Sequence, residues 1–203
     1  MPTLTKSNFN KYLENFSDDI RYANMLSRVI LDFHMPDSEK RPILLKGSYY
    51  NSTVFRLIAK AFFQEMILSV AKLFEERKNN LSLAMFLRKI QIDFRIFEGK
   101  ESREELLKLI DNTVRIIEKE AYRIRRVLTY RDKLLAHHEP GIFISRETIS
   151  ITASLTMDDI VKLIQISEDI IRQIGALTSV EIKISSDWIS EDYEDMLKRL
   201  VGE

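Results

Sequence analysis

The feature that most restricts the fold of this chain is the length of the stretches that glycine and proline leave uninterrupted. The chain has 203 residues but only five glycines and four prolines, and almost all of them lie between segments with periodic apolar positions. Inside a helix, glycine costs about 1 kcal/mol and proline about 3 kcal/mol relative to alanine. Their placement between the segments therefore favours long helices.

Apolar residues recur every three or four positions in these stretches, the spacing that places them on one face of a helix. We expect amphipathic helices over 7–33 and 156–177, a nearly all-apolar and therefore buried helix over 49–77, a short helix after Ser82, the longest helix from Ser102 to about 138, and a last short helix after Trp188. In the longest of these helices the predicted buried stripe is Leu106, Leu107, Ile110, Val114, Ile117, Ala121, Ile124, Leu128 and Leu135.

Residues that favour helix starts support several of these bounds. Ser82 is a plausible cap of the short helix, and Thr156 or Asp158 of the helix that follows. Residues 34–48 are expected to form a loop, and the alternating, β-branched segment 142–153 is a candidate for a small hairpin or extended arm. We therefore predict one all-α domain over 1–203, a helical bundle with at most a short hairpin.

Composition excludes several classes of protein. There is no cysteine, which excludes disulfides, thiol catalysis and thiolate metal sites. The polar N-terminus does not resemble a secretory signal, and no run approaches the ~20 apolar residues of a membrane span. We expect a soluble, cytoplasmic protein. Acidic and basic residues balance at 31 each, so any attraction to a polyanion has to come from local charge.

The segment "RDKLLAHHEP" carries the candidate chemistry. Continuing the buried stripe in steps of three and four places Arg131 and His138 on the apolar face, whereas His137 lies about 240° beyond Arg131. A charged residue on such a face is costly unless it is paired or lies at an interface. Pro140 disfavours helical geometry just before it, which weakens the argument from phase at the histidines.

Charge is unevenly distributed around this segment. Residues 121–138 contain five basic side chains, Arg123, Arg125, Arg126, Arg131 and Lys133, against the single carboxylate of Asp132. Such a patch can receive a phosphate backbone. A neighbouring histidine titrates near neutral pH, so it can move the proton of a 2′-hydroxyl while a cation neutralises charge on phosphorus. Metal-free RNA cleavage requires this combination of groups.

A purely structural interpretation is also open. Arginine, lysine and protonated histidine near a helix C-terminus interact favourably with its dipole, so the segment can serve only to end a helix. We expect His34 to be a surface or capping residue. The carboxylates of "FEERKNN", "REELLK" and "ISEDYEDML" are expected to lie on solvated faces, because none pairs with a histidine at metal-ligand spacing. No metal site and no cofactor motif is predicted.

The segment "RDKLLAHHE" resembles the signature of the HEPN superfamily, an arginine and a polar residue followed by a histidine. Arg131, Asp132 and His137 fit it with five intervening residues, and His138 fits it with six. The order of "SVAKLFEERKNNLSLAMFLRKI", "YRDKLLAHHE" and "LTMDDIVKLIQISEDII" is similar to the HEPN branch associated with abortive phage infection of the U type. This resemblance covers roughly residues 50–175.

The resemblance implies a helical bundle that forms a homodimer with both copies of the motif facing one cleft. It implies a metal-independent endoribonuclease of a toxin or phage-defence system that leaves 2′,3′-cyclic phosphate ends. Arg131 would stabilise the scissile phosphate, Asp132 would orient the pair, and His137 would be the general base or acid. Motif alignment favours His137, and periodicity favours His138. Arg123, Arg125, Arg126 and Lys133 would hold the RNA.

A function without catalysis stays open on this resemblance. Some members keep the fold without catalysis and bind only a nucleotide, an RNA or a partner protein. An antitoxin protein is a further expected partner. One subgroup is silenced by modification of a tyrosine two residues after the histidine, but here that position is Glu139. That route of control is therefore in doubt for this chain.

Overall fold

The structure, a computed structural model, describes residues 4–34, 53–76, 81–93, 103–136 and 155–178, together with residues 180, 182 and 184. Within these ranges it contains α-helices and no strand. The helices are α1 (Lys6–His34), α3 (Thr53–Phe74), α4 (Leu83–Ile92), α5 (Arg103–Lys119), α6 (Ala121–Ala136) and α7 (Met157–Thr178). The predicted all-α class is confirmed. The hairpin predicted over 142–153 and the last helix after Trp188 lie outside the described residues.

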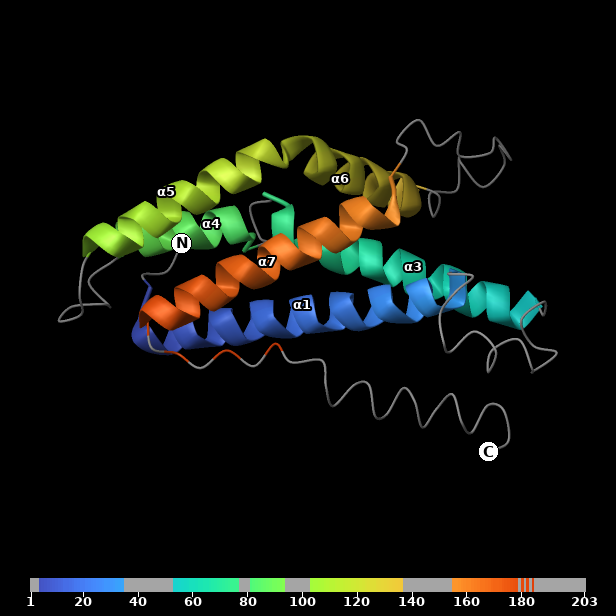
Figure 1. The fold of residues 1–203 in the computed structure, drawn as a ribbon, viewed down its shortest axis with the longest axis horizontal. Coiled ribbons are helices and arrows are strands. Elements are labelled where there is room, and N and C mark those ends of the chain that lie inside the picture. The colour runs from blue at the N-terminus through green and yellow to red at the C-terminus, as the bar shows by residue number, and fades with distance from the viewer. Residues whose placement is uncertain are drawn as a thin grey trace.

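The bundle is built around α1, α3 and α7. Helix α1 packs along both of the others and runs in the opposite direction to them (Figure 1). Its apolar face is buried because its phenylalanines, leucines and isoleucines recur at helical spacing. Largest among the fully buried side chains of the protein are Phe9, Phe86, Leu13, Ile20, Leu26, Met66, Ile67, Leu73, Leu83, Leu87, Ile90 and Ile160. In the part of the chain that the structure describes, no helix combines the length and apolar character that a membrane crossing needs.

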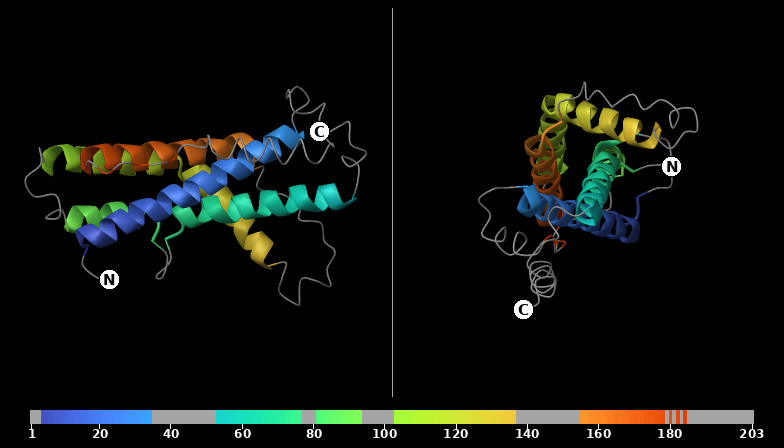
Figure 2. Two further views of the ribbon diagram at one scale, coloured as in Figure 1. Left: turned by 90° about the horizontal axis from the view of Figure 1, so that it is seen from below. Right: turned by 90° about the vertical axis from the view of Figure 1, so that its right-hand side faces the viewer.

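The segment predicted as one long helix is two helices, and that prediction was wrong. The chain bends at Glu120, so α5 packs on α4 and α7, while α6 crosses α3. In the end-on view of Figure 2, α6 lies across the picture, whereas α5 is seen nearly along its axis. Hydrogen bonding continues through the bend, from Glu120 N to Ile116 O at 3.1 Å and from Ile124 N to Glu120 O at 3.0 Å.

The bend changes which residues face the core. Ala121, predicted to be buried, is exposed, whereas Thr113, Glu120 and Val127 are buried. One row of buried or half-buried positions at helical spacing runs from α5 into α6, through Leu106, Ile110, Thr113, Ile117, Glu120, Ile124, Val127 and Arg131. The seam therefore crosses the bend without interruption and includes two charged residues.

Two predicted helix caps are found where expected. The Ser82 hydroxyl accepts a hydrogen bond from Met85 N at 3.3 Å at the start of α4. The Thr156 hydroxyl accepts one from Asp159 N at 3.2 Å, which decides between Thr156 and Asp158 as the cap of α7.

Candidate functional site

Arg131 lies near the end of α6, in the phase that the sequence predicts for the buried face. Its exposed fraction is 6 %, which is unusual for arginine in a helical bundle. The packing of α6 on α3 creates this environment, with the ring of Tyr130 set edge-on against that of Phe63 at a centroid distance of 5.7 Å. The prediction that Arg131 belongs to the buried stripe is confirmed.

Two carboxylates hold the Arg131 guanidinium. Its Nη1 lies 2.5 Å from Oε2 of Glu75, the residue that directly follows α3. Its Nε and Nη2 lie 2.9 and 2.8 Å from Oδ1 of Asp132, the next residue of α6. The Asp132 side chain is 60 % exposed, and that of Glu75 is 15 % exposed. The structure thus brings Arg131 and Asp132 of the predicted site together and adds Glu75.

Glu75 is the residue that sequence reasoning missed. The expectation that the carboxylates of "FEERKNN" lie on a solvated face is wrong for Glu75, although it holds for Glu76, whose side chain is 48 % exposed and pairs with Arg88 at 3.2 Å. A signal was present: Glu75 follows the buried Ala71 by four residues, and its N–H donates to Ala71 O at 2.9 Å. Glu75 therefore continues the apolar face of α3.

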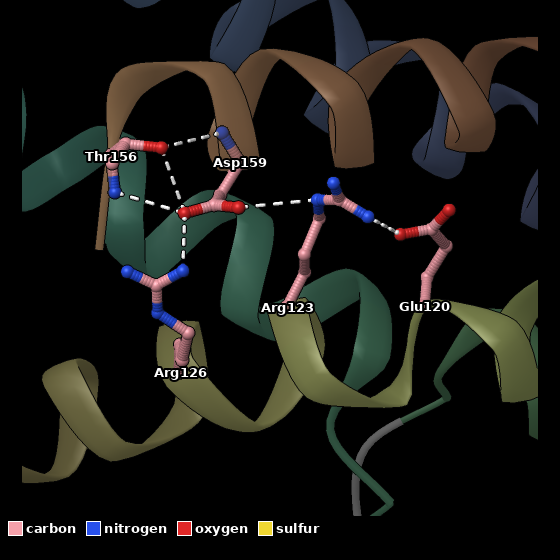
Figure 3. A network of polar contacts seen from close by, with 5 residues as sticks. All are labelled: Glu120, Arg123, Arg126, Thr156 and Asp159. Carbon is pink, nitrogen blue, oxygen red and sulfur yellow. Dashed lines mark hydrogen bonds and ion pairs between the residues drawn. The ribbon is translucent and has the colours of Figure 1, made fainter. Parts of the chain in front are cut away.

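A second polar network joins α6 to the start of α7 (Figure 3). Asp159 is only 7 % exposed and accepts hydrogen bonds from the Thr156 hydroxyl at 2.8 Å and the Thr156 N–H at 3.0 Å. It also pairs with Arg126 Nη1 at 2.8 Å and Arg123 Nε at 3.1 Å. On its other side, Arg123 pairs with the buried carboxylate of Glu120.

This network shifts the titration of its members. Burial alone would raise the pKa of Asp159, but hydrogen bonds from Thr156 and the charges of Arg126 and Arg123 outweigh it and hold that pKa below its usual value. The hydrogen bond and charge of Glu120, with a smaller effect of Asp159, raise the pKa of Arg123 further above its usual value. Both groups are therefore charged at neutral pH.

The ion pairs reduce the net charge that the basic segment 121–138 contributes to the surface. Three of its five cations, Arg123, Arg126 and Arg131, pair with carboxylates of this chain. Glu75 and Asp159 come from segments far away in the sequence, so a count along 121–138 does not include them. Arg125 is exposed, and Lys133 is half-buried. The charge that faces solvent is consequently smaller than the sequence count indicates.

The remaining predicted residues, His137 and His138, follow α6 directly and lie outside the described residues. Their roles stay predictions, as does RNA binding by Arg123, Arg125, Arg126 and Lys133. Among the residues that the structure describes, no group of three or more histidine, aspartate or glutamate side chains is arranged to hold a metal ion.

Comparison with known proteins agrees with the motif. A HEPN family model described as AbiU2 matches residues 6–200, which is nearly the whole chain and includes both α6 and the histidines. Comparisons with curated proteins and with solved structures gave no match. The match covers nearly the whole chain, and it agrees with the helical fold and with the Arg131–Asp132 pair near the end of α6. The chain therefore belongs to the AbiU2 family of HEPN proteins.

Proposed function

We propose that this protein is a metal-independent endoribonuclease of a toxin or phage-defence system. The observation that carries the proposal is the position of Arg131, a buried arginine near the end of α6 that is hydrogen-bonded to Asp132, in a helix that His137 and His138 follow directly in the sequence. Membership of a HEPN family named for abortive infection supports it. Phosphodiester transfer needs a group that moves a proton and a cation that stabilises the charge on the phosphate.

The proposed reaction is attack of an RNA 2′-oxygen on the adjacent phosphorus. His137 takes the proton of the 2′-hydroxyl, or supplies one to the leaving 5′-oxygen, and His138 is the second candidate for each role. The 2′-oxygen forms a bond to phosphorus, the bond from phosphorus to the 5′-oxygen breaks, and Arg131 stabilises the charge on the phosphoryl oxygens. The products are a 2′,3′-cyclic phosphate and a 5′-hydroxyl.

A single copy of the motif offers one arginine and two adjacent histidines for these tasks. We propose that the protein acts as a homodimer in which two copies of the end of α6 face one RNA-binding cleft. Arg125 is then the first candidate for a contact to the RNA backbone, because it is exposed, whereas Arg123 and Arg126 are engaged by Asp159; Lys133 is a further candidate. A partner protein that covers this cleft would act as the antitoxin.

An RNA cleavage assay in excess chelator tests the proposal. We expect the wild type to cleave, and Arg131→Ala and His137→Ala each to abolish cleavage while the oligomeric state seen by size-exclusion chromatography is kept. His34→Ala is the matched control, since it removes the one histidine outside the motif and should cleave like the wild type. Full cleavage by both motif variants would contradict the proposal.

The engagement of Arg123, Arg126 and Arg131 by carboxylates favours one alternative, a HEPN module that binds a nucleotide, an RNA or a partner protein without turnover. In that case the wild type would bind RNA or nucleotide in a salt-dependent way and release no product. Appearance of cyclic phosphate ends in the wild type, and not in His137→Ala, would exclude this alternative.

A further inference from the structure

Glu75, which directly follows α3, forms an ion pair with Arg131 near the end of α6, yet it is not part of the motif that suggests the reaction. Its Oε2 lies 2.5 Å from Arg131 Nη1, and both side chains are largely buried, at 15 % and 8 % exposure. A buried ion pair contributes little net stability, because desolvation of both charges offsets their attraction. The pair is therefore better explained by what it does to the geometry of Arg131.

The contacts divide the guanidinium into an occupied and an available part. A guanidinium has five N–H donors in a planar fork. Asp132 takes the edge formed by Nε and Nη2, and Glu75 takes one N–H of Nη1. With respect to the described residues, one N–H on Nη1 and one on Nη2 stay available. Guanidinium N–H donors of this kind form charge-assisted hydrogen bonds with the oxygens of a phosphate.

Of the two carboxylates, Glu75 is the more firmly held. Asp132 belongs to α6 itself, and its side chain is 60 % exposed, so water competes for it. Glu75 directly follows a different helix, α3, and its N–H donates to the backbone oxygen of Ala71, which is buried. The edge-on contact of Phe63 with Tyr130 also packs α3 against α6. Glu75 therefore ties the guanidinium to the core and not only to its own helix.

We infer that Glu75 is a positioning residue that holds the Arg131 guanidinium so that its outer donors meet the scissile phosphate. The inference rests on the proposed function and adds to it a residue outside the motif. It distinguishes Glu75 from Glu76, which is adjacent in sequence but exposed and paired with Arg88. Glu76→Ala is consequently the matched control for every change at Glu75.

The test is single-turnover RNA cleavage by Glu75→Ala, Glu75→Gln and Glu76→Ala, with rates corrected for the folded fraction measured by circular dichroism. We expect Glu75→Ala to lower the rate constant by ~10–100-fold, because a small displacement of a catalytic group has that effect. Glu75→Gln keeps an oxygen acceptor for Nη1 and should recover most of the rate. Glu76→Ala should match the wild type.

The pH dependence of the same rates separates positioning from proton transfer. Because Glu75 acts through Arg131, the shape of the profile should be the same in Glu75→Ala as in the wild type. A lost limb would mean that Glu75 is itself an acid or base, and would overturn the inference. An unchanged rate in Glu75→Ala would overturn it too. A faster rate would show that Glu75 competes with phosphate for Arg131, which also overturns it.

Binding of a 2′-O-methyl RNA, which has no nucleophile and cannot be cleaved, keeps the two proposals separable. Arg131→Ala and Glu75→Ala should weaken binding by similar factors, and the double variant should bind no more weakly than Arg131→Ala. A wild type that binds this RNA but never cleaves would contradict the ribonuclease proposal, and the binding comparison would still decide on Glu75. Equal binding by the wild type and Glu75→Ala, or no binding by either, would contradict the positioning role.

Discussion

The carboxylate of Glu75 and the guanidinium of Arg131 form a largely buried ion pair, 2.5 Å between Oε2 and Nη1, that joins the end of α3 to the end of α6. Each residue needs the other as its counterion, because a buried charge without a counterion destabilises the folded state. The pair as a whole is less important for stability, since apolar residues of similar size often replace a buried ion pair without loss.

The first prediction separates these two effects. Arg131→Met leaves the buried Glu75 carboxylate without this cation, so we expect the free energy of unfolding to fall by about 3 kcal/mol. The double variant Glu75→Leu/Arg131→Met removes both charges and should return to within about 1 kcal/mol of the wild type. Urea denaturation monitored by circular dichroism measures both values.

An exposed ion pair is the control for this experiment. Glu76→Leu/Arg88→Met removes a pair whose side chains are 48 % and 65 % exposed, so its effect should stay below about 1 kcal/mol. If the Glu75→Leu/Arg131→Met double variant were as unstable as Arg131→Met alone, loss of the whole pair would itself be costly and the pair would contribute to stability directly, contrary to this prediction.

The second prediction concerns Asp159, which is buried and holds Thr156, Arg126 and Arg123 together. Asp159→Asn removes the carboxylate charge, so we expect the free energy of unfolding at pH 7 to fall by about 2 kcal/mol. Asp158→Asn, a change at the exposed neighbour in the same turn of α7, is the control and should have a much smaller effect.

The lowered pKa of Asp159 gives this effect a pH dependence. Since the pKa is lower in the folded state, the stabilisation is present above the unfolded-state value of about 3.9 and is lost as pH falls through the folded-state value. The difference in stability between the wild type and Asp159→Asn should therefore shrink below about pH 4. A difference that stayed constant from pH 7 to pH 3 would argue against this account of the network.

The third prediction tests how the chain turns back after α7. A Cβ at Gly175 would lie 2.9 Å from the backbone oxygen of Val180 and closer still to the side chain of Ile182, whereas Val180 N donates to Gly175 O at 2.9 Å. The backbone oxygen of Val180 cannot move away without disturbing the hydrogen bond between Val180 N and Gly175 O. Gly175→Ala should thus lower the free energy of unfolding by about 1–3 kcal/mol despite its better helix propensity.

The exposed neighbour Ala176 is the control for Gly175. Ala176→Ser should change the free energy of unfolding by no more than about 0.5 kcal/mol in the same urea titration. Stabilisation by Gly175→Ala would mean that helix propensity dominates at this position and that the close approach of residues 180 and 182 is easily relieved.

The fourth prediction uses the salt dependence of RNA binding to compare Arg125 with Arg123. Arg125 is exposed, whereas Arg123 is paired with Glu120 and Asp159. Each phosphate contact to a single strand adds about 0.7 to the slope of log affinity against log salt concentration. With 2′-O-methyl RNA, Arg125→Ala should reduce the slope by about that amount, and Arg123→Ala by less. The reverse order would show that Arg123 leaves its carboxylates to bind RNA.

Apolar periodicity was sufficient to predict the helical character of the described segments and the buried position of Arg131. Both are local properties of a helix face, and the phase of the face places Arg131 against the core whatever lies opposite. The bend at Glu120 could not be predicted in this way. No glycine or proline marks it, and the hydrogen bonds around Glu120 continue as in a helix, so nothing local marks the bend, and it accompanies the packing of α5 and α6 on different neighbours.

The partners of the charged residues could not be predicted either. Glu75 reaches Arg131 from α3, and Asp159 reaches Arg126 from α7, so their proximity depends on tertiary packing and not on spacing. The segment 121–138 therefore had the composition of a basic patch, whereas the folded protein supplies it with counterions. The family, by contrast, was indicated by the sequence itself, in the order of Arg131, Asp132 and His137.

The most direct test of the central claim is cleavage of an RNA that carries one 2′-deoxy substitution at its cleavage position, with chelator present and product ends mapped. If the 2′-oxygen is the nucleophile, the unmodified RNA yields a 2′,3′-cyclic phosphate and a 5′-hydroxyl, and the substituted RNA is not cut at that position. Cleavage of the substituted RNA, or products with a 5′-phosphate, would contradict the proposed chemistry of Arg131 and His137.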